Sequence, residues 1–319
     1  MSTALKPVVT RFRAYQLGEP GSSFSYFADG HFTLIEAMVT ELSRPRLLAE
    51  LAQCGRRTID TLHITSWDLD HCKPSSLEWI LAHLTPTRVE QPGYAPHTEC
   101  GHECRRTVEQ YQQRCAARGH RVTVQSIDPP YIASLEHAQS LGYRDIFYHP
   151  RQLHDTPNDN STIKFFRRGA FNVLSLGDVE APEIASLLRR CKTLCREVDI
   201  MILAHHGADN GFTNRRLLEE LRPSLAICTS DYDNRFEHPR DEIRALLHEQ
   251  GIRLFTTKTG DAIVESIGSH AADYQVTNLI GNSTRVSSVM RYRARKFALL
   301  SMNADTVRNV LRPGFRGLR

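Results

Sequence analysis

Residues 61–74, TLHITSWDLDHCKP, limit the possible folds and functions of this chain more than any other segment. An apolar run over 62–65 is typical of a buried strand, and it is followed within a few residues by Asp68, Asp70 and His71. Ionised carboxylates at the edge of a buried sheet need a cation, a network of donors or water to compensate their charge. A divalent metal ion is the cation that best holds two carboxylates and an imidazole together. We therefore predict a metal-binding strand end here.

The bulk properties are those of a soluble globular protein. The chain has 319 residues, of which 40% are hydrophobic and 24% charged, so it can form one large domain or two modest ones. No apolar run approaches the roughly 20 residues of a membrane helix, and the N-terminus lacks the apolar core of a signal peptide. We expect a cytoplasmic protein without a membrane span, whose eight cysteines are free thiols or metal ligands.

Strand and helix patterns alternate along most of the chain. Residues 8–39 have the alternation of strands joined by turns, 128–160 read as polar connections, and 252–266 read as a hairpin. Helices are predicted at 45–54, 75–84, 102–118 and 183–198, and further strands at 62–65, 121–127, 161–166 and 170–178. The alternation predicts an α/β fold, with one main domain over 1–268 and a short basic C-terminal extension over 269–319.

Polar residues follow three further apolar strands. Asp178 comes after SLG, the pair His205 and His206 precedes Gly207, and His238 precedes a proline. Each alone has an ordinary explanation as a helix cap, a turn residue or a solvated side chain. Together with residues 68–71 they form a set of carboxylates and imidazoles at the carboxyl ends of strands, where α/β sheets place their sites. Such a set suits zinc, manganese or iron, and a bridging Asp is the usual means of holding two ions.

Read in order, SWDLDHCKP, NDNSTIKF, SLGDVE, ILAHHGADNGFT and NRFEHP resemble the motifs of the metallo-β-lactamase superfamily. The pattern is most similar to the branch typified by the hydrolase domain of ComEC, a competence DNA-uptake protein. That branch carries a His-x-Asp-x-Asp-His motif, an Asn-rich turn, a Gly-Asp, a His-His-Gly and a late His-Pro in this order. The resemblance spans residues 8–268. It implies a four-layer αββα sandwich with metal ions in a cleft at one edge, and the activity of a metal-dependent hydrolase.

The resemblance also implies a set of metal ligands. Asp70 and His71 would bind one ion together with either His205 or His206, between which the sequence does not decide, and Asp178 would be the bridging carboxylate. Zinc or manganese is expected, as one ion or two. Asp68 stands where the superfamily has a second histidine, so it is a further candidate ligand.

Catalytic and substrate-binding roles are implied for the remaining motif residues. Asp68 or Asp70 would orient the attacking water, and His238 would polarise the substrate or donate a proton. Asn158 and Asn160, in the Asn-rich turn, and Asp209, after the histidine pair, are expected on the substrate side of the site. The alternative for the asparagines is a plain Asx turn.

The chain departs from the family pattern at several points. Ser66 replaces the first histidine of the motif, and the glycine-rich segment with a buried acid that is expected near the first hairpin is altered. These changes leave open a site with two ions, a site with one ion, and a degenerate module that binds a partner without catalysis. His149 and His154 are possible substitute ligands, with surface histidines as the alternative.

A phosphodiester is the substrate that the resemblance favours, because the similar branch acts on nucleic acid. The chain is thus predicted to be a phosphodiesterase or nuclease that uses a metal-activated water. The alternative is a hydrolase of a small molecule such as a cyclic nucleotide, a lactone or a thioester. The arginines of the C-terminal extension, from Arg285 to Arg319, would contact phosphates or a protein partner. The oligomeric state is not predicted.

The cysteines offer a second metal site as a weaker hypothesis. Cys100, His102 and Cys104 lie close together, with Cys115 and His120 further on. Their spacing matches no common zinc motif, and Cys104 and Cys115 fall on a segment of helical pattern. We therefore do not expect a structural zinc there.

Overall fold

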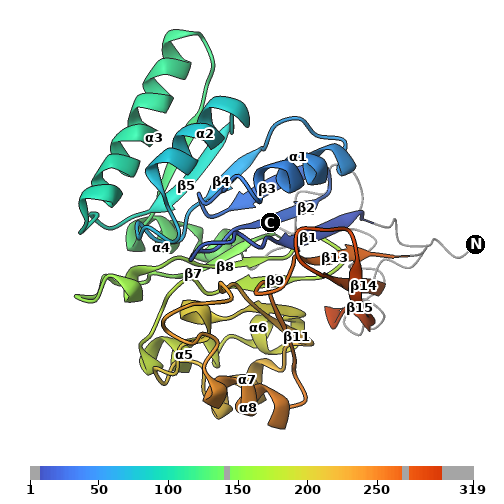
Figure 1. Ribbon diagram of the computed structural model, residues 1–319. Helices are drawn as coiled ribbons and strands as arrows, with labels where there is room; N and C mark the ends of the chain where they lie inside the picture. The colour runs from blue at the N-terminus through green and yellow to red at the C-terminus, as the bar shows by residue number, and fades with distance from the viewer. Residues whose placement is uncertain (1–7, 140–143, 268–272, 297–319) are drawn as a thin grey trace, which may run out of the picture.

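Two β-sheets packed face to face form the centre of the fold, and helices cover their outer faces (Figure 1). The computed structural model describes residues 8–139, 144–267 and 273–296. The first sheet has nine strands in the order β15-β14-β13-β1-β2-β3-β4-β5-β6, and the second has six in the order β12-β11-β10-β9-β8-β7.

The strands of the first sheet are β1 (Thr10–Ala14), β2 (Phe24–Ala28), β3 (His31–Ile35), β4 (Thr61–His63), β5 (Arg88–Pro92), β6 (Thr123–Ile127), β13 (Ala262–Ser266), β14 (Asp273–Leu279) and β15 (Val286–Arg293). Those of the second are β7 (Ile146–His149), β8 (Ile163–Phe166), β9 (Val173–Ser175), β10 (Ile200–Ile202), β11 (Leu225–Cys228) and β12 (Arg253–Thr256). The helices are α1 (Arg44–Gln53), α2 (Pro74–His83), α3 (Glu99–Ala117), α4 (Pro129–Gln139), α5 (Pro182–Leu188), α6 (Lys192–Glu197), α7 (Arg215–Leu221) and α8 (Asp241–Glu249), with short 3-10 turns η1 (Asn158–Asn160) and η2 (Ala204–Gly207).

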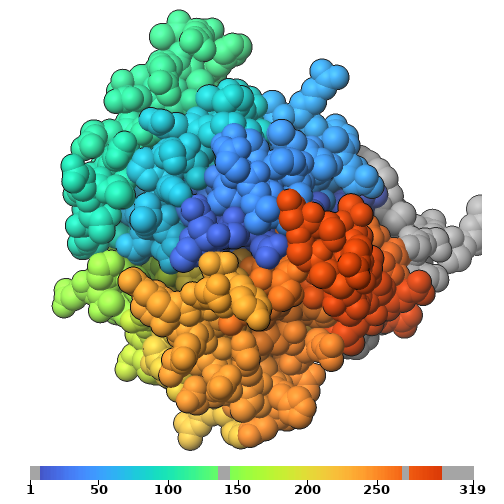
Figure 2. Space-filling view, in the orientation of Figure 1, coloured from blue at the N-terminus to red at the C-terminus, as the bar shows by residue number. Residues whose placement is uncertain are grey.

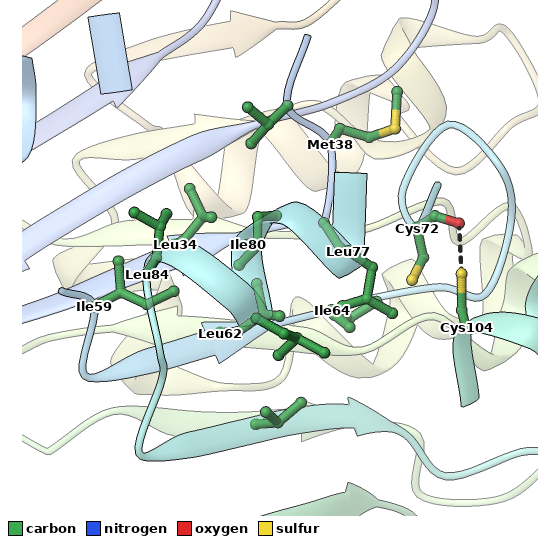
Figure 3. Close-up of a cluster of buried hydrophobic side chains, with 14 of the residues drawn as sticks. Leu34, Met38, Ile59, Leu62, Ile64, Cys72, Leu77, Ile80, Leu84 and Cys104 are labelled. Atoms are coloured by element: carbon green, nitrogen blue, oxygen red, sulfur yellow. Dashed lines mark hydrogen bonds between the residues drawn. The ribbon is translucent and has the colours of Figure 1, made fainter. Parts of the chain in front are cut away.

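Three large hydrophobic clusters separate the four layers. One includes Leu34 and Leu62 of the first sheet together with Ile80 of α2, and Figure 3 shows these side chains meeting. A second lies under α5–α8, and a third between the two sheets contains Phe24 and Phe166. Burial of apolar area is the main stabilising term in folding, so these three interfaces hold the four layers of the fold together. The αββα sandwich predicted from the sequence is confirmed.

The space-filling view shows how the two halves of the chain meet. In Figure 2 the N-terminal part of the chain lies against the part that follows residue 200, along a boundary across the middle of the molecule. In the part of the chain that the structure describes, no helix combines the length and apolar character needed to cross a membrane.

The hairpin predicted over 252–266 is wrong. β12 pairs in parallel with β11 in the second sheet, whereas β13 pairs antiparallel with β1 in the first. The connection crosses between the sheets, and Asp261 at its end accepts hydrogen bonds from the main chain of Gln16 (2.8 Å) and from the Arg13 guanidinium. Alternation of apolar and polar residues identifies a strand but not the sheet to which it belongs. Here that sheet depends on polar contacts with residues far away in the sequence.

The boundary predicted at residue 268 does not separate two structural units. β14 and β15 continue the first sheet beyond β13, and Tyr274 and Val276 are fully buried in the cluster between the sheets. Of the basic residues expected in the extension, Arg291 and Arg293 lie on the edge strand β15. Those at 308, 312, 316 and 319 lie outside the described residues.

Two elements occur where polar connections were expected, and one predicted helix is divided. Residues 128–160 contain α4 and β7, and 183–198 form the two helices α5 and α6. The pair Pro129–Pro130 suggests a break in secondary structure, yet proline is well tolerated in the first turn of a helix. Asp128 precedes α4, and its carboxylate accepts a hydrogen bond from the main-chain N–H of Tyr131 at 2.8 Å.

Candidate metal centre

Loops from both sheets meet at one edge of the sandwich. β3 and β4 are parallel neighbours in the first sheet, and β9, β10 and β11 are parallel neighbours in the second. The carboxyl ends of parallel strands lie at the same edge, so the loops that follow them converge there. The acidic and histidine residues identified in the sequence lie on these loops.

Four side chains from three loops come together. Asp70, His71, Asp178 and His206 each offer one ligand atom, and all four atoms lie within 4.8 Å of one another. Ligands of a single ion bound at 2.0–2.2 Å lie roughly 3.3–4.4 Å apart, so small inward movements bring this set onto one ion. Two carboxylates and two imidazoles suit a divalent transition metal or zinc.

The structure distinguishes between the two adjacent histidines. His206 belongs to the cluster, whereas Nδ1 of His205 lies 2.5 Å from Oε1 of Glu180. Both have a left-handed backbone, with φ of 52° for His206 and 45° for His205. Such a conformation is costly for residues other than glycine and concentrates at functional sites. Here it aims one imidazole at the cluster and the other at Glu180.

Second partners fix the orientation of both cluster histidines. Nδ1 of His206 donates to the carbonyl of Thr229 at 2.9 Å, which leaves Nε2 facing Asp70 at 3.2 Å. Nδ1 of His71 lies 3.2 Å from Oε1 of Glu36, and the Thr65 hydroxyl, 3.3 Å away, itself donates to the same carboxylate. Both neighbours can only accept from Nδ1, so a proton sits there, and Nε2 presents a lone pair when the imidazole is neutral.

The environment of Nε2 of His71 fits a cation. This nitrogen is buried, and Oδ2 of Asp178 lies only 3.0 Å from it. In the neutral imidazole both atoms are acceptors, and two acceptors at that distance are favourable when both bind one positive ion. Burial lowers the pKa of His71, but the carboxylates of Asp178, Glu36 and Asp70 outweigh it and raise the pKa well above its ordinary value. The cluster thus concentrates negative charge at the position where a metal ion would bind.

Glu36 is a functional residue that the sequence analysis missed. It follows β3 directly, it is almost fully buried, and its carboxylate accepts from the main-chain N–H of Thr65 at 3.0 Å as well as from the Thr65 hydroxyl at 2.6 Å. A buried carboxylate behind a metal-binding imidazole holds the tautomer and raises the basicity of the ligand. The available signal was an acid at the end of a strand, the same signal that identified Asp178.

Glycines allow the close approach of the ligand loops. Gly177 has a φ of +58°, and a Cβ placed on it would lie 2.8 Å from Cβ of Ser161. A Cβ on Gly21 would lie 2.9 Å from the carbonyl oxygen of Asp70, and the next residue, Ser22, donates its N–H to that oxygen at 2.9 Å. The loop LGEPGSS, which departs from the family pattern, therefore packs directly on the ligand loop and anchors it.

Asp68 lies outside the cluster. Its Oδ2 accepts a hydrogen bond from the Ser66 hydroxyl at 2.6 Å, and Ser66 also lies 3.0 Å from the hydroxyl of Tyr94. The carbonyl of Asp68 accepts from the main chain of His71 and Cys72 at 2.9 and 2.8 Å. These bonds form the turn that presents Asp70 and His71.

His238 lies at the outer side of the cluster. Its ring stacks on that of His206 with centroids 6.3 Å apart and planes 10° apart, and it also stacks on the ring of Phe236 at 5.6 Å and 22°. The guanidinium of Arg235 lies 4.6 Å from the centroid of the Phe236 ring. Partial burial, followed by the nearby imidazoles of His206 and His205, lowers the pKa of His238 to about 4. These contacts join His206, a candidate metal ligand, through His238 to Phe236, which is 55% exposed.

The asparagines serve the turn more than a substrate. Asn160 is buried, its Oδ1 accepts from the main-chain N–H of His154 at 2.7 Å, and its amide N–H groups donate to the carbonyls of His154 and Thr156. The expected substrate contact of Asn160 is therefore not supported, and the Asx alternative describes it better. Asn158 donates to Glu180 at 2.9 Å, the carboxylate that also meets His205, and Asp209 is solvent-exposed.

A residue between the two asparagines, Asp159, anchors the loop of Asp178. Its Oδ1 accepts from the main-chain N–H groups of Glu180 and Ala181, both at 2.8 Å, just before α5. Its carbonyl accepts from Nε2 of His149 at 2.6 Å. His149 and the neighbouring His154 are therefore not part of the cluster, and His149 instead supports this turn.

Among the described residues, no cysteine belongs to a group of three or more close ligand atoms. The one such group found in these residues is that of Asp70, His71, Asp178 and His206. All eight cysteines are free thiols. Sγ of Cys104, on α3, donates to the carbonyl of Cys72 at 3.2 Å, a bond drawn in Figure 3. This contact ties α3 to the residue that follows His71.

The chain is similar in sequence to one curated relative. ComE operon protein 3 of Bacillus subtilis (strain 168) is 24% identical to it over 225 residues, which are 68% of this chain. The chain spans only 26% of the length of that relative. No model of a protein family matches the chain.

Solved structures show similar arrangements of sheets and helices. A mutant of CmlA beta-hydroxylase shares 14% identity, with a TM-score of 0.46 over 80% of this chain and 53% of that one. A metal-dependent hydrolase of the beta-lactamase superfamily shares 12% identity, with a TM-score of 0.45 over 79% of this chain and 98% of that one. Likeness at this level assigns no function by itself.

Proposed function

We propose that this chain is a metal-dependent hydrolase of the metallo-β-lactamase superfamily that cleaves phosphodiester bonds in nucleic acid. The observation that carries the proposal is the cluster of Asp70, His71, Asp178 and His206, whose ligand atoms lie within 4.8 Å of one another. The ordered motifs, the four-layer fold and the similarity to a ComE operon protein support it. A complete four-residue set favours an enzyme over a degenerate binding module, because such sets are costly to keep without a cation.

Zinc or manganese bound by these four side chains would lower the pKa of a bound water and stabilise negative charge on the attacked group. The chain's own residues prepare that chemistry. Glu36 keeps the proton of His71 on Nδ1, and the Thr229 carbonyl does the same for His206, so both Nε2 atoms remain available. We propose that His238, which stacks on His206, hydrogen-bonds an oxygen of the substrate.

The loop that carries His238 supports a nucleic-acid substrate. Tyr232 and Phe236 are 68% and 55% exposed, and Arg235 lies against the Phe236 ring. Exposed aromatic rings beside a basic side chain are typical of surfaces on which unpaired bases stack. The same loop carries Asp231, Asp233 and Glu237. It therefore has no net positive charge, and we expect stacking to contribute more to substrate affinity than attraction of the phosphates.

A nuclease assay tests the proposal. Single-stranded DNA and RNA oligonucleotides are incubated with the purified protein in manganese, zinc or magnesium, alongside Asp70→Ala and Asp178→Ala. We expect hydrolysis by the wild type and a loss of at least about 100-fold in both variants, since each removes a charged ligand. Equal residual activity in all three preparations would assign the activity to a contaminant.

The same preparation separates the alternatives. Cyclic nucleotides, lactones and thioesters are offered in parallel, and activity confined to one of these would replace the nuclease by a small-molecule hydrolase. Failure to load any metal would leave only a binding function.

A further inference from the structure

We infer that the centre holds one metal ion rather than two, and that a hydrogen-bonded network of Ser66, Tyr94 and Asp68 stands where a second ion would need ligands. The inference rests on the metal centre of the proposed function but not on its substrate. It also makes Asp68 a positioning residue instead of a ligand.

The ligand geometry provides for one ion. The four ligand atoms of Asp70, His71, Asp178 and His206 are mutually within 4.8 Å, so one ion uses all of them. A second ion would share a carboxylate with the first and would need about three further ligands of its own. Among the described residues no other group of three close His, Cys, Asp or Glu ligand atoms is found.

The side chains in the altered motif are already engaged with each other. The hydroxyl of Ser66 is fully buried and donates to Oδ2 of Asp68 at 2.6 Å. Because that proton is used, the 3.0 Å contact between Ser66 and Tyr94 has the phenol as its donor. The main-chain N–H of Trp67 donates to the phenol oxygen at 3.2 Å. The Ser66 hydroxyl, the Tyr94 hydroxyl and Oδ2 of Asp68 thus each have a partner within the protein.

The chemistry of this network is poor for metal binding. A serine hydroxyl is a neutral, weak donor to a metal, unlike the imidazole that the motif has at this position in the resembling family. Burial raises the pKa of the Tyr94 phenol, with only partial relief from its hydrogen bonds to Ser66 and Trp67, so the phenol stays protonated. The carboxylate of Asp68 is held by the shortest bond of the network and is absent from the cluster.

The network has a structural purpose that explains its position. The carbonyl of Asp68 accepts the N–H groups of His71 and Cys72, and the Asp68 N–H lies 3.2 Å from the Ser66 hydroxyl. Through these bonds it sets the turn on which Asp70 and His71 reach the cluster. Asp68 therefore acts through the two ligands that follow it.

Metal stoichiometry tests the inference with a matched pair of variants. The protein is saturated with manganese or zinc, freed of excess metal by gel filtration, and analysed by elemental mass spectrometry. We expect one equivalent per chain in the wild type and in Asp68→Asn, and less than about 0.1 equivalent in Asp70→Asn, the same change two residues away. Circular dichroism and thermal melts verify that each variant is folded, and Ser66→Ala, expected to keep one equivalent, provides a second variant in case Asp68→Asn does not fold.

Electron paramagnetic resonance of the manganese form gives a second readout. One isolated ion yields an uncoupled six-line spectrum, whereas two ions bridged by a carboxylate yield a coupled spectrum. Two equivalents in the wild type, or loss of the metal from Asp68→Asn, would overturn the inference while leaving the hydrolase proposal standing. One equivalent without phosphodiester hydrolysis would overturn the proposed substrate while supporting the inference. A wild type that binds no metal would overturn both.

Discussion

Oε1 of Glu36 lies 3.2 Å from Nδ1 of His71, and this contact joins the end of β3 to the metal centre. Both side chains are almost fully buried, and Glu36 reaches the position through a left-handed backbone with a φ of 70°. A buried carboxylate on a residue with a strained backbone, Glu36, thus orients the imidazole of His71.

Glu36→Gln is therefore expected to weaken metal binding by about 10- to 100-fold, the usual effect of removing a carboxylate behind a metal-binding histidine. The amide keeps the size of the side chain but lacks the charge that favours the Nδ1 proton. Competition with a chelating indicator dye measures the affinity. Glu90→Gln is the matched control, since Glu90 lies 3.0 Å from Nδ1 of a different buried histidine, His63. Equal losses of affinity in both variants would indicate a general effect on folding and contradict the assigned role of Glu36.

Gly177→Ala is expected to lower both stability and metal affinity. The added Cβ would lie 2.8 Å from Cβ of Ser161 in a residue with a φ of +58°, so the loop that carries Asp178 must move. The strain of the left-handed conformation alone costs about 1–2 kcal/mol, and the clash adds to it. Gly30→Ala has a similar φ of +75° but nothing within 4 Å of the new Cβ. Urea denaturation with metal titration should show a stability loss in both variants, and a loss of affinity in Gly177→Ala alone.

The ligand residues could be located from the sequence because each follows an apolar strand, and strand ends are visible as a change from apolar to polar residues. The choice between His205 and His206 could not be made in this way. It depends on two successive positive φ angles, which no local pattern of these residues announces. Glu36 was missed for a related reason, since TLIEAMV reads as a strand that continues, whereas the chain turns sharply at the glutamate.

The sequence could not predict to which of the two sheets the last strands belong, and the reason is physical. Alternation in 252–266 specifies strands, but β12 and β13 belong to different sheets, and Tyr274 and Val276 bury β14 in the core. These outcomes are decided by packing between segments more than 200 residues apart, such as β1 against β13. Asp68 is an opposite case. Its spacing in the motif suggested a metal ligand, whereas its carboxylate accepts a hydrogen bond from Ser66 and lies outside the cluster.

Phe236→Ala is expected to reduce the affinity for a single-stranded oligonucleotide by roughly 5- to 150-fold, since stacking of a base on an aromatic ring contributes about 1–3 kcal/mol. The ring is 55% exposed, and an exposed contact with Arg235 is worth only about 0.5–1 kcal/mol, so a base can displace the guanidinium. Fluorescence anisotropy with calcium in place of the catalytic metal measures binding without cleavage. Arg291→Ala on the edge strand β15 is the comparison. A larger effect at Arg291 would move the nucleic-acid surface to the C-terminal strands.

Stability is expected to fall as the pH is lowered from about 6.5 to about 4, in part because of His149. Burial, only partly offset by the hydrogen bond to the Asp159 carbonyl, lowers the pKa of His149 to about 4. Between these values the unfolded chain binds a proton that the folded protein does not, so the free energy of unfolding decreases by up to about 3 kcal/mol. In His149→Gln, which retains an N–H donor, the dependence on pH should be shallower. Urea denaturation at pH 7.5, 6 and 5 checks this, and parallel curves for both proteins would contradict it.

Lys164 is expected to stabilise the fold although it lies on β8, outside the loops that carry the candidate metal ligands. Its Nζ lies 2.7 Å from Oε2 of Glu90 and over the rings of Phe147 and Phe166, and it joins β8 of the second sheet to β5 of the first. Lys164→Met leaves a buried carboxylate without its strongest counter-charge. We expect a loss of about 3–5 kcal/mol in the free energy of unfolding, the usual effect of breaking a buried ion pair from one side.

The double variant Lys164→Met with Glu90→Leu removes both charges and fills the space with apolar atoms. It should recover much of that loss, because a buried ion pair and a well-packed apolar pair are often of similar stability. Urea denaturation of the wild type, both single variants and the double variant completes the cycle. Metal content should remain at the wild-type level throughout, since the pair lies away from Asp70, His71, Asp178 and His206. A single variant that is as stable as the wild type would show that the pair is solvated in solution and does not hold the sheets together.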